Sequence, residues 1–230
     1  SRCLDGDMTI IDGDTKLGDL VTAHPALARE LERRGLDYCC GGAASLGEAC
    51  ATQGLDVGSV VGELQSAATD APLAEWAQMD APALADHIES THHRYLHEEL
   101  PRIAALVAKI VDVHGARHPE LTEISQCFDA VRADLEPHLK KEERVLFPLV
   151  RDPNRNQALI ERPIAMMAME HDQVGDLLKQ MRTLTHDYEV PADGCATYAA
   201  TFAAMEQLEA DTHLHIHKEN NVLFPMVLDH

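Results

Sequence analysis

The frame His-x-x-x-Glu-x-x-x-x-Phe-Pro occurs twice in the sequence, as HLKKEERVLFP from His138 and as HIHKENNVLFP from His215. Each copy places a carboxylate, Glu142 or Glu219, one helical turn after an imidazole, so both side chains would lie on one face of a helix. Imidazole and carboxylate groups are ligands for transition metals. A Glu at this spacing can reach a second ion, so the repeat indicates two metal ions bridged by two carboxylates.

Four long helical stretches are expected to position these residues, over residues 83–113, 119–149, 156–187 and 195–227. The breaks between them carry the turn sequences HGARHP, RDPNRN and VPADG. The sustained apolar alternation that is typical of β-strands is absent, and only 4% of the residues are aromatic. Amphipathic helices with short connections predict an all-α protein with an antiparallel, up-down-up-down four-helix bundle.

The candidate ligands fall on the apolar stripe of each helix, where leucine-like residues belong. The stripe of the second helix runs through Leu121, Ile124, Phe128, Val131, Leu135, His138, Glu142, Val145 and Leu149. The stripe of the fourth runs through Tyr198, Phe202, Met205, Leu208, Thr212, His215, Glu219, Val222 and Met226. The first and third helices each add one inward histidine, His93 and His171, so all of these polar side chains are predicted to face the bundle axis.

These histidines are also expected to lie at one depth in the bundle, because residues equidistant from the turn of an antiparallel hairpin lie level with each other. The midpoint of His93 and His138 is 115.5, inside HGARHP, and that of His171 and His215 is 193, inside VPADG. A lone His/Glu pair at this spacing is usually a surface pair. Two carboxylates in an apolar layer, however, would cost several kcal/mol unless cations compensate them.

The ligand types bear on the identity of the metal. Imidazole and carboxylate ligands with open coordination positions favour redox-active iron over structural zinc, which prefers thiolates and closed tetrahedral geometry. Manganese or a mixed pair of ions is an alternative. We expect Glu142 and Glu219 to bridge the ions and four imidazoles to complete the site.

Three ionisable residues next to the expected ligands are candidates for supporting them or lining an access path. Glu89 precedes His93 by one turn, His97 follows it by one turn, and Glu170 is adjacent to His171. A plain surface position is the alternative for Glu170.

Other potential ligands are weaker candidates. His213 and His217 are expected to face solvent, because counting back ten residues from Pro225 reaches His215. His92 departs from the apolar stripe. The three methionines of the third helix are expected to fill the core and not to bind copper: Met166, Met167 and Met169.

The chain is expected to divide into a flexible N-terminus (1–14), a small helical domain (15–68), a linker (69–82) and the bundle (83–230). In the small domain we expect a short helix that opens near Thr15 and a second from Pro25 to Arg34. Gly35 would end the second helix, and Gly41-Gly42 would form a turn.

Charge and cysteine content narrow the class of protein further. The net charge of −20, from 39 acidic and 19 basic residues, disfavours binding to nucleic acid or to anionic membranes. No apolar run approaches the roughly 20 residues of a membrane span, and no charged-then-apolar leader opens the sequence. Two of the six cysteines, Cys39 and Cys40, are adjacent, which does not suit a disulfide framework. We therefore expect a water-soluble cytoplasmic protein with reduced thiols.

Five segments occur in the order LDYCCGGAASLGEAC, THHRYLHEELP, HLKKEERVLFP, MEHD and HIHKENNVLFP. Together they resemble the RIC (repair of iron centres) family, which are di-iron proteins with a hemerythrin-like bundle, and the resemblance covers nearly the whole chain. It implies two non-haem irons per chain, bridged by carboxylates and by an oxo or hydroxo group. It assigns the ligand role to His93, His138, Glu142, His171, His215 and Glu219.

The resemblance also implies repair of iron-sulfur clusters damaged by oxidative or nitrosative stress, by iron donation to client iron-sulfur proteins. It implies a cytoplasmic location and a homodimer. Cys39 and Cys40 match the family's Cys-Cys-Gly-Gly motif, and Cys50 lies in the same segment. A buried pair of inert thiols is the commoner physical case, but adjacent thiols beside two glycines could accept iron or nitrosyl groups.

Our hypothesis is a labile di-iron centre that oxygen or nitric oxide destabilises, so that iron leaves past Cys39 and Cys40. One alternative is a hemerythrin-like module that reversibly carries or senses oxygen or nitric oxide. Another is an enzyme that reduces nitric oxide or peroxide. A bundle stabilised by zinc is the least expected.

Overall fold

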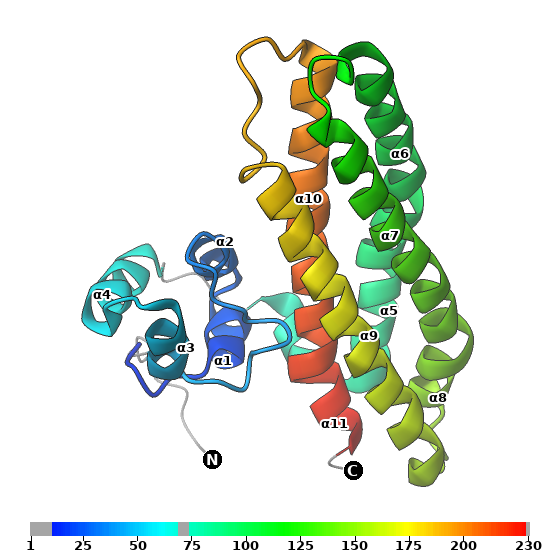
Figure 1. The fold of residues 1–230 in the computed structure, drawn as a ribbon. Coiled ribbons are helices and arrows are strands. Elements are labelled where there is room, and N and C mark those ends of the chain that lie inside the picture. Colours follow the sequence, from blue (N-terminus) through cyan, green and yellow to red (C-terminus); the bar gives the residue numbers. More distant parts are fainter. Residues whose placement is uncertain (1–10, 69–73, 229–230) are drawn as a thin grey trace.

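The computed structural model describes residues 11–68 and 74–228. All regular structure in these ranges is helical, apart from an isolated bridge between Lys16 and Ser45. Four long helices stand side by side with alternating direction, and a cluster of short helices lies against one side of them (Figure 1). The predicted all-α architecture, with an antiparallel bundle and a small helical N-terminal part, is confirmed. None of the helices in the described ranges is long and apolar enough to cross a membrane.

Three of the four bundle helices are interrupted by a π-helical turn, which contains one more residue than an α-helical turn. The first consists of α5 (Ala81–Ile88), the π-turn η3 (Glu89–His93) and α6 (Arg94–His114). The second consists of α7 (Glu120–Lys141), η4 (Glu142–Leu146) and α8 (Phe147–Arg151). The third is α9 (Gln157–Leu184), and the fourth consists of α10 (Ala196–Lys218), η5 (Glu219–Leu223) and α11 (Phe224–Leu228).

The π-turn η4 shifts the apolar stripe of the second bundle helix. A regular helix with Glu142 inward would also point Val145 inward, as the sequence predicted, but Val145 is 49% exposed. The neighbouring Leu146 is 1% exposed and Phe147 is fully buried. The prediction for Val145 is wrong because the extra residue of the π-turn rotates the chain beyond Glu142.

The small unit, residues 11–68, buries apolar side chains in a cluster that continues into the bundle. It contains α1 (Leu17–Ala23), the 3-10 turn η1 (Pro25–Leu27), α2 (Ala28–Glu32), α3 (Leu46–Gln53) and α4 (Val57–Ala67). Gly35 follows α2 with a positive φ of 66°, as expected for a residue that ends a helix. The sequence reading missed α3 and α4, although both carry a start signal. Ser45 and Glu48 form a capping box at α3, and Asp56 accepts from the N–H of Ser59 at α4.

The expected flexible N-terminus and the expected linker lie partly outside the described residues, at 1–10 and 69–73. Residues 11–14 already pack on the small unit: Ile11 is 3% exposed and its backbone N–H donates to Gln65. In the expected linker, the 3-10 turn η2 (Glu75–Gln78) buries Trp76 in an apolar cluster with residues of the bundle. The domain limits stay a prediction.

The register shift at η4 predicts opposite results for two adjacent truncations. Leu146→Ala removes a buried side chain and should lower the free energy of unfolding by about 2–5 kcal/mol. Val145→Ala should change it by no more than about 0.5 kcal/mol, because the side chain is exposed. Urea denaturation of the metal-free protein measures both values. Equal losses at the two positions would contradict the π-turn.

Candidate metal centre

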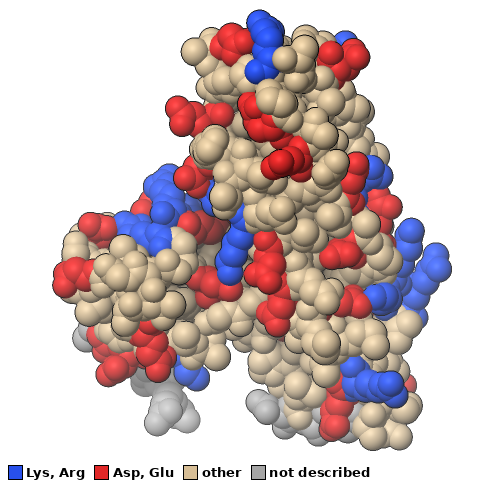
Figure 2. Space-filling model, viewed as in Figure 1, with Lys and Arg blue, Asp and Glu red and all other residues tan. Residues whose placement is uncertain are grey.

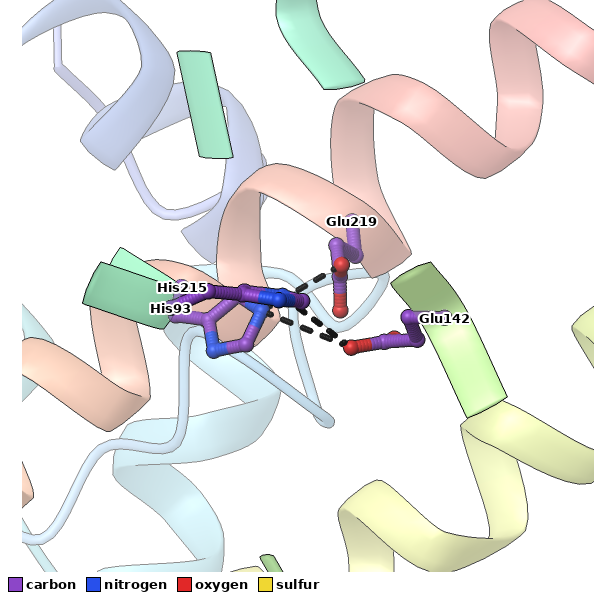
Figure 3. Close-up of side chains that lie close together, drawn as sticks. All are labelled: His93, Glu142, His215 and Glu219. Atoms are coloured by element: carbon purple, nitrogen blue, oxygen red, sulfur yellow. Dashed lines mark ion pairs between the residues drawn. The ribbon is translucent and has the colours of Figure 1, made fainter. Parts of the chain in front are cut away.

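Six side chains from all four bundle helices meet in the core near the π-turns. They form two overlapping groups whose potential ligand atoms lie within 4.8 Å of one another. One group is His93, Glu142, His215 and Glu219 (the 93/215 half-site, Figure 3), and the other is His138, Glu142, His171 and Glu219 (the 138/171 half-site). Each of the six residues is at most 2% exposed. The layer of four imidazoles and two carboxylates that the sequence predicted is present.

Each carboxylate presents one oxygen to each half-site. In the 93/215 half-site, Glu142 Oε2 lies 3.3 Å from His93 Nε2, and Glu219 Oε1 lies 3.3 Å from His215 Nε2 (Figure 3). In the 138/171 half-site, Glu142 Oε1 lies 3.2 Å from Nε2 of His138, and Glu219 Oε2 lies 3.1 Å from Nε2 of His171. Glu142 and Glu219 therefore span the two half-sites in the manner of bridging ligands.

Several of these buried polar atoms make no hydrogen bond within the described protein. They are Nε2 of His93, both ring nitrogens of His215 and all four carboxylate oxygens of Glu142 and Glu219. Leaving such groups unpaired is costly in an apolar core. Two donor atoms that are each about 2.1 Å from one ion lie roughly 3.0–3.5 Å apart, which agrees with the nitrogen–oxygen distances above. The residues fit a carboxylate-bridged pair of metal ions.

The π-turns place three of the candidate ligands at their ends. Glu142 is the first residue of η4, Glu219 is the first residue of η5, and His93 is the last residue of η3. The extra residue lets Glu142 and the Leu146–Phe147 pair point to the core together. A regular helix could not bury all three on one narrow stripe, so the π-turns reconcile the polar site with the apolar packing below it.

Three of the four imidazoles are oriented by a partner on Nδ1. The Nδ1 atoms of His93 and His138 lie 3.0 Å and 2.8 Å from carboxylate oxygens of Glu143 and Glu170. His171 Nδ1 lies 2.8 Å from the amide oxygen of Asn220. An Nδ1–H that donates to an acceptor leaves the lone pair of Nε2 directed at the centre, and a carboxylate partner makes the ring a stronger ligand.

The orientation of His215 differs from that of the other three histidines. Its Nδ1 has no hydrogen-bond partner in the described protein. The ring is stacked instead on His92, with 5.5 Å between centroids and 5° between planes. Nδ1 of His92 pairs with Asp211 at 2.9 Å, and its Nε2 accepts from the Lys218 ammonium at 2.7 Å. His215 is therefore held by packing, whereas the other rings are held by hydrogen bonds.

The supporting residues proposed from the sequence are placed in three ways. Glu170 contacts the candidate ligand His138 and also pairs with Lys141. His97 Nε2 lies 2.7 Å from the oxygen of Glu143 that also accepts from His93. His97 is therefore linked to His93 through Glu143. Glu89 points elsewhere and pairs with Arg151 at the surface.

Two supporting residues were missed in the sequence, Glu143 and Asn220. Each directly follows one of the bridging carboxylates. That adjacency was the available signal, but the direction of each side chain depends on the π-turn. Asn220 accepts from Nδ1 of His171 and is the amide partner of that ring.

The expectation that His213 and His217 face solvent is wrong. His217 is fully buried, and its Nε2 lies 3.1 Å from Thr22 Oγ1. His213 is half-buried, and its Nδ1 lies 3.4 Å from Glu32. The small unit covers this face of α10, a contact between distant segments that helical periodicity does not reveal (Figure 1).

The expectation that three methionines fill the core holds for one of them. Met167 is 3% exposed, whereas Met166 and Met169 are 45% and 66% exposed. Residues one before and two after an inward position of a helix point away from the core. The apolar type of these two side chains is therefore not a sign of burial.

The metal-free centre is strongly ionised. Burial and mutual repulsion would raise the pKa of Glu219, and burial would raise that of Glu142, but the surrounding imidazoles hold both pKa values below the usual range. Burial would lower the pKa of His93 and that of His171, but the two carboxylates raise these pKa values to about 9 and about 10. Protons on the imidazoles thus compensate the carboxylates when cations are absent.

The two parts of the chain match two known families. Residues 83–227 match the hemerythrin HHE cation binding domain, and residues 13–68 match ScdA_N, a domain of unknown function. The "Probable iron-sulfur cluster repair protein" of Haemophilus influenzae is 31% identical over 93% of this chain and 96% of its own length.

Two further relatives carry related names. The "Iron-sulfur cluster repair protein ScdA" of Staphylococcus haemolyticus is 30% identical over 94% of this chain and 98% of its own length. The "Iron-sulfur cluster repair protein YtfE" of Escherichia coli O1:K1 / APEC is 31% identical over 94% and 97%. Fold and site define a hemerythrin-like cation-binding bundle with a small helical unit in front of it. The chain belongs to the family of iron-sulfur cluster repair proteins.

Metal binding should release protons, because His93 and His171 must give up protons to become ligands. A pH of 7 is below the pKa values of His93 and His171, which are about 9 and about 10, so both rings are protonated in the metal-free protein. Affinity should therefore rise with pH between 6 and 8, by up to about tenfold per unit for each displaced proton. Calorimetry at pH 7 in two buffers of different ionisation enthalpy should report about two protons released. A release of none would contradict the protonated centre.

Proposed function

We propose that the chain holds two non-haem irons and donates iron to damaged iron-sulfur clusters. The observation that supports this most directly is the pair of buried carboxylates, Glu142 and Glu219, each with one oxygen at each half-site. Imidazole and carboxylate donors without thiolate suit iron or manganese better than a structural zinc. The names of the relatives at about 30% identity favour iron and supply the proposed clients.

The residues divide the work of holding and releasing the metal. Glu142 and Glu219 would bridge, while two imidazoles at each half-site would complete a set of two nitrogens and two oxygens. Bound iron would supply redox chemistry and open positions for oxygen or nitric oxide. His215 lacks a hydrogen bond that fixes its ring, and loss of such a partner typically weakens a metal site. The 93/215 half-site is therefore suited to giving up its ion.

Cys39 and Cys40 are the proposed first stop for departing iron. Their sulfurs are 3.9 Å apart, and Asp37 completes a group of three potential ligands within 4.8 Å. Two thiolates that share one ion lie roughly 3.7 Å apart, given metal–sulfur distances of about 2.3 Å. The neighbouring Cys40 and burial hold the pKa of Cys39 well above its usual range, so metal must displace a proton there. The pair is therefore a place for transient binding.

Two other functions remain as alternatives within the same fold. A module that carries or senses oxygen or nitric oxide would keep its iron through many cycles of ligand binding. An enzyme that reduces nitric oxide or peroxide would turn over with a reductant. The thiol pair favours donation over carriage, because a reversible carrier does not need a group of thiol ligands outside the bundle.

The proposal is tested by following iron during nitric oxide exposure. We expect two irons per chain in protein from iron-replete cells, and transfer of iron to an apo iron-sulfur protein that is present during the exposure. His138→Ala should lower the iron content to one per chain or fewer, because it removes a buried imidazole from one half-site. His118→Ala is the matched control at the far end of the bundle, where the ring pairs with Glu120 and Asp193, and it should retain two irons. Reversible gas binding without iron loss would favour the carrier, and sustained turnover would favour the enzyme.

Replacing both Cys39 and Cys40 with Ala should leave two irons bound and slow iron transfer to the acceptor about tenfold or more. The bundle ligands are untouched, so the change isolates the proposed relay. Metal analysis gives the iron content, and recovery of the acceptor's cluster absorbance gives the rate. Transfer at the rate of the unmodified protein would show that iron leaves by another route.

A further inference from the structure

The small unit rests on the bundle through the loop that carries the two cysteines. Asn221, in the π-turn η5, donates from Nδ2 to the carbonyl oxygens of Tyr38 and Cys39, at 3.2 Å and 2.9 Å. Its Oδ1 atom fits against Gly42 and Gly18. A Cβ on Gly18 would lie 2.8 Å from this oxygen, and one on Gly42 would lie closer still. The loop is therefore shaped around the Asn221 side chain.

The other side of the loop faces α9. Gly175 lies on α9 one turn after the ligand His171, and a Cβ at this position would lie 3.8 Å from Cys40 Sγ. That distance is an ordinary van der Waals contact, so the Cys40 sulfur lies close against α9 at this residue. Cys39 is 5% exposed in this arrangement. Figure 2 shows the small unit in contact with the middle of the bundle.

Asn220 joins this loop to the metal centre. Its Oδ1 lies 2.8 Å from Nδ1 of His171, and its Nδ2 donates to the carbonyl oxygen of Cys39 at 3.4 Å. One side chain thus contacts a ligand imidazole and the backbone of the thiol loop. The corresponding partners of His93 and His138 are Glu143 and Glu170, whose other contacts are with the bundle residues His97 and Lys141.

We propose that Asn220 and Asn221 are positioning residues that couple the seating of the Cys39–Cys40 loop to metal retention at the 138/171 half-site. The inference rests on the proposed di-metal site. When His171 is bound to metal, its ring is fixed, Asn220 is fixed with it, and the loop is held with its thiols closed. When the loop leaves the bundle, His171 loses the restraint on its ring. Coupling between two sites acts equally in both directions.

This coupling would link the release of iron from the bundle to the exposure of the thiols that receive it. In the 93/215 half-site, His215 lacks a hydrogen-bonded partner whatever the loop does. In the 138/171 half-site, the support of His171 depends on the loop. An acceptor that draws the thiol loop away from the bundle would loosen the second ion at the moment the thiols become accessible. Asn221 holds the loop against the bundle, and Asn220 connects the position of the loop to the orientation of the His171 ring.

The test compares thiol accessibility with and without metal. Protein is loaded anaerobically with two equivalents of Fe²⁺, desalted and treated with iodoacetamide, and modification of Cys39 and Cys40 is followed by peptide mass spectrometry. The measured quantity is the ratio of the modification rate in metal-free protein to that in loaded protein. We expect a ratio of about ten in the unmodified chain, within the usual range of coupling between sites.

The variant Asn220→Asp separates the coupling to the loop from the support of the His171 ring. The aspartate keeps an acceptor for His171 Nδ1 but loses the N–H group that donates to Cys39, so the ratio should fall to about one. Metal should be retained at least as firmly as in the unmodified chain, because a carboxylate partner strengthens an imidazole ligand. A purely structural defect would loosen the metal, so it would not give this combination.

Two other variants control for loosening of the interface. Asn221→Ala should speed modification in both states, because the seat of the loop is lost. His213→Ala removes a different contact between α10 and the small unit, that with Glu32. It should change both rates and leave the ratio near that of the unmodified chain.

The outcomes separate this inference from the proposed function. Uptake of no iron by the unmodified chain would remove the di-metal site and the inference with it. Two bound irons with a ratio of one in the unmodified chain would overturn the coupling alone. An unchanged ratio in Asn220→Asp would also overturn the coupling, because the hydrogen bond from Asn220 to Cys39 would then have no effect on thiol accessibility.

Discussion

The structure depends on the burial of two carboxylates, Glu142 and Glu219, in the apolar core of a four-helix bundle. Both are fully buried, and their oxygens make no hydrogen bond within the described protein. Protons on the neighbouring imidazoles compensate their charge in the metal-free chain, as the raised pKa values of His93 and His171 indicate. Cations can replace those protons at the same positions. The other features of the site serve to hold this charge in place at a tolerable cost in stability.

The sequence predicted the bundle and the polar layer because both follow from periodicity. Apolar spacing located the four helices, and the distances of His93 and His138 from their shared turn placed the rings at one level. The π-turns were not predictable in this way, because an extra residue in one turn leaves the pattern on either side intact. Val145 was therefore assigned to the core in error, and the direction of Glu143 was not foreseen.

The position of the small unit on the bundle could not be predicted from the sequence pattern either. His217 looked like one of several polar residues on α10, but the small unit buries it against Thr22 and Tyr38. This contact joins residues almost 200 positions apart, and no local propensity encodes it. Asn220 and Asn221 acquire their contacts for the same reason, so the link from thiol loop to ligand became visible only in three dimensions.

The two half-sites are chemically alike in their ligands but unlike in their support. The 138/171 half-site is held by a carboxylate and by an amide that touches the thiol loop, whereas His215 of the other half-site is held by stacking on His92. Unequal support suits a centre that parts with metal in steps better than one that keeps it. The asymmetry is thus in keeping with iron donation by a repair protein.

The most direct test of the central claim is an anomalous-difference map at the iron edge from crystals of iron-loaded protein. The account predicts two peaks per chain, separated by roughly 3.5–4 Å as in other two-metal sites. Each peak should lie between two imidazoles, with Glu142 and Glu219 contributing one oxygen to each. A single peak, or two peaks that do not share these carboxylates, would contradict the bridged centre.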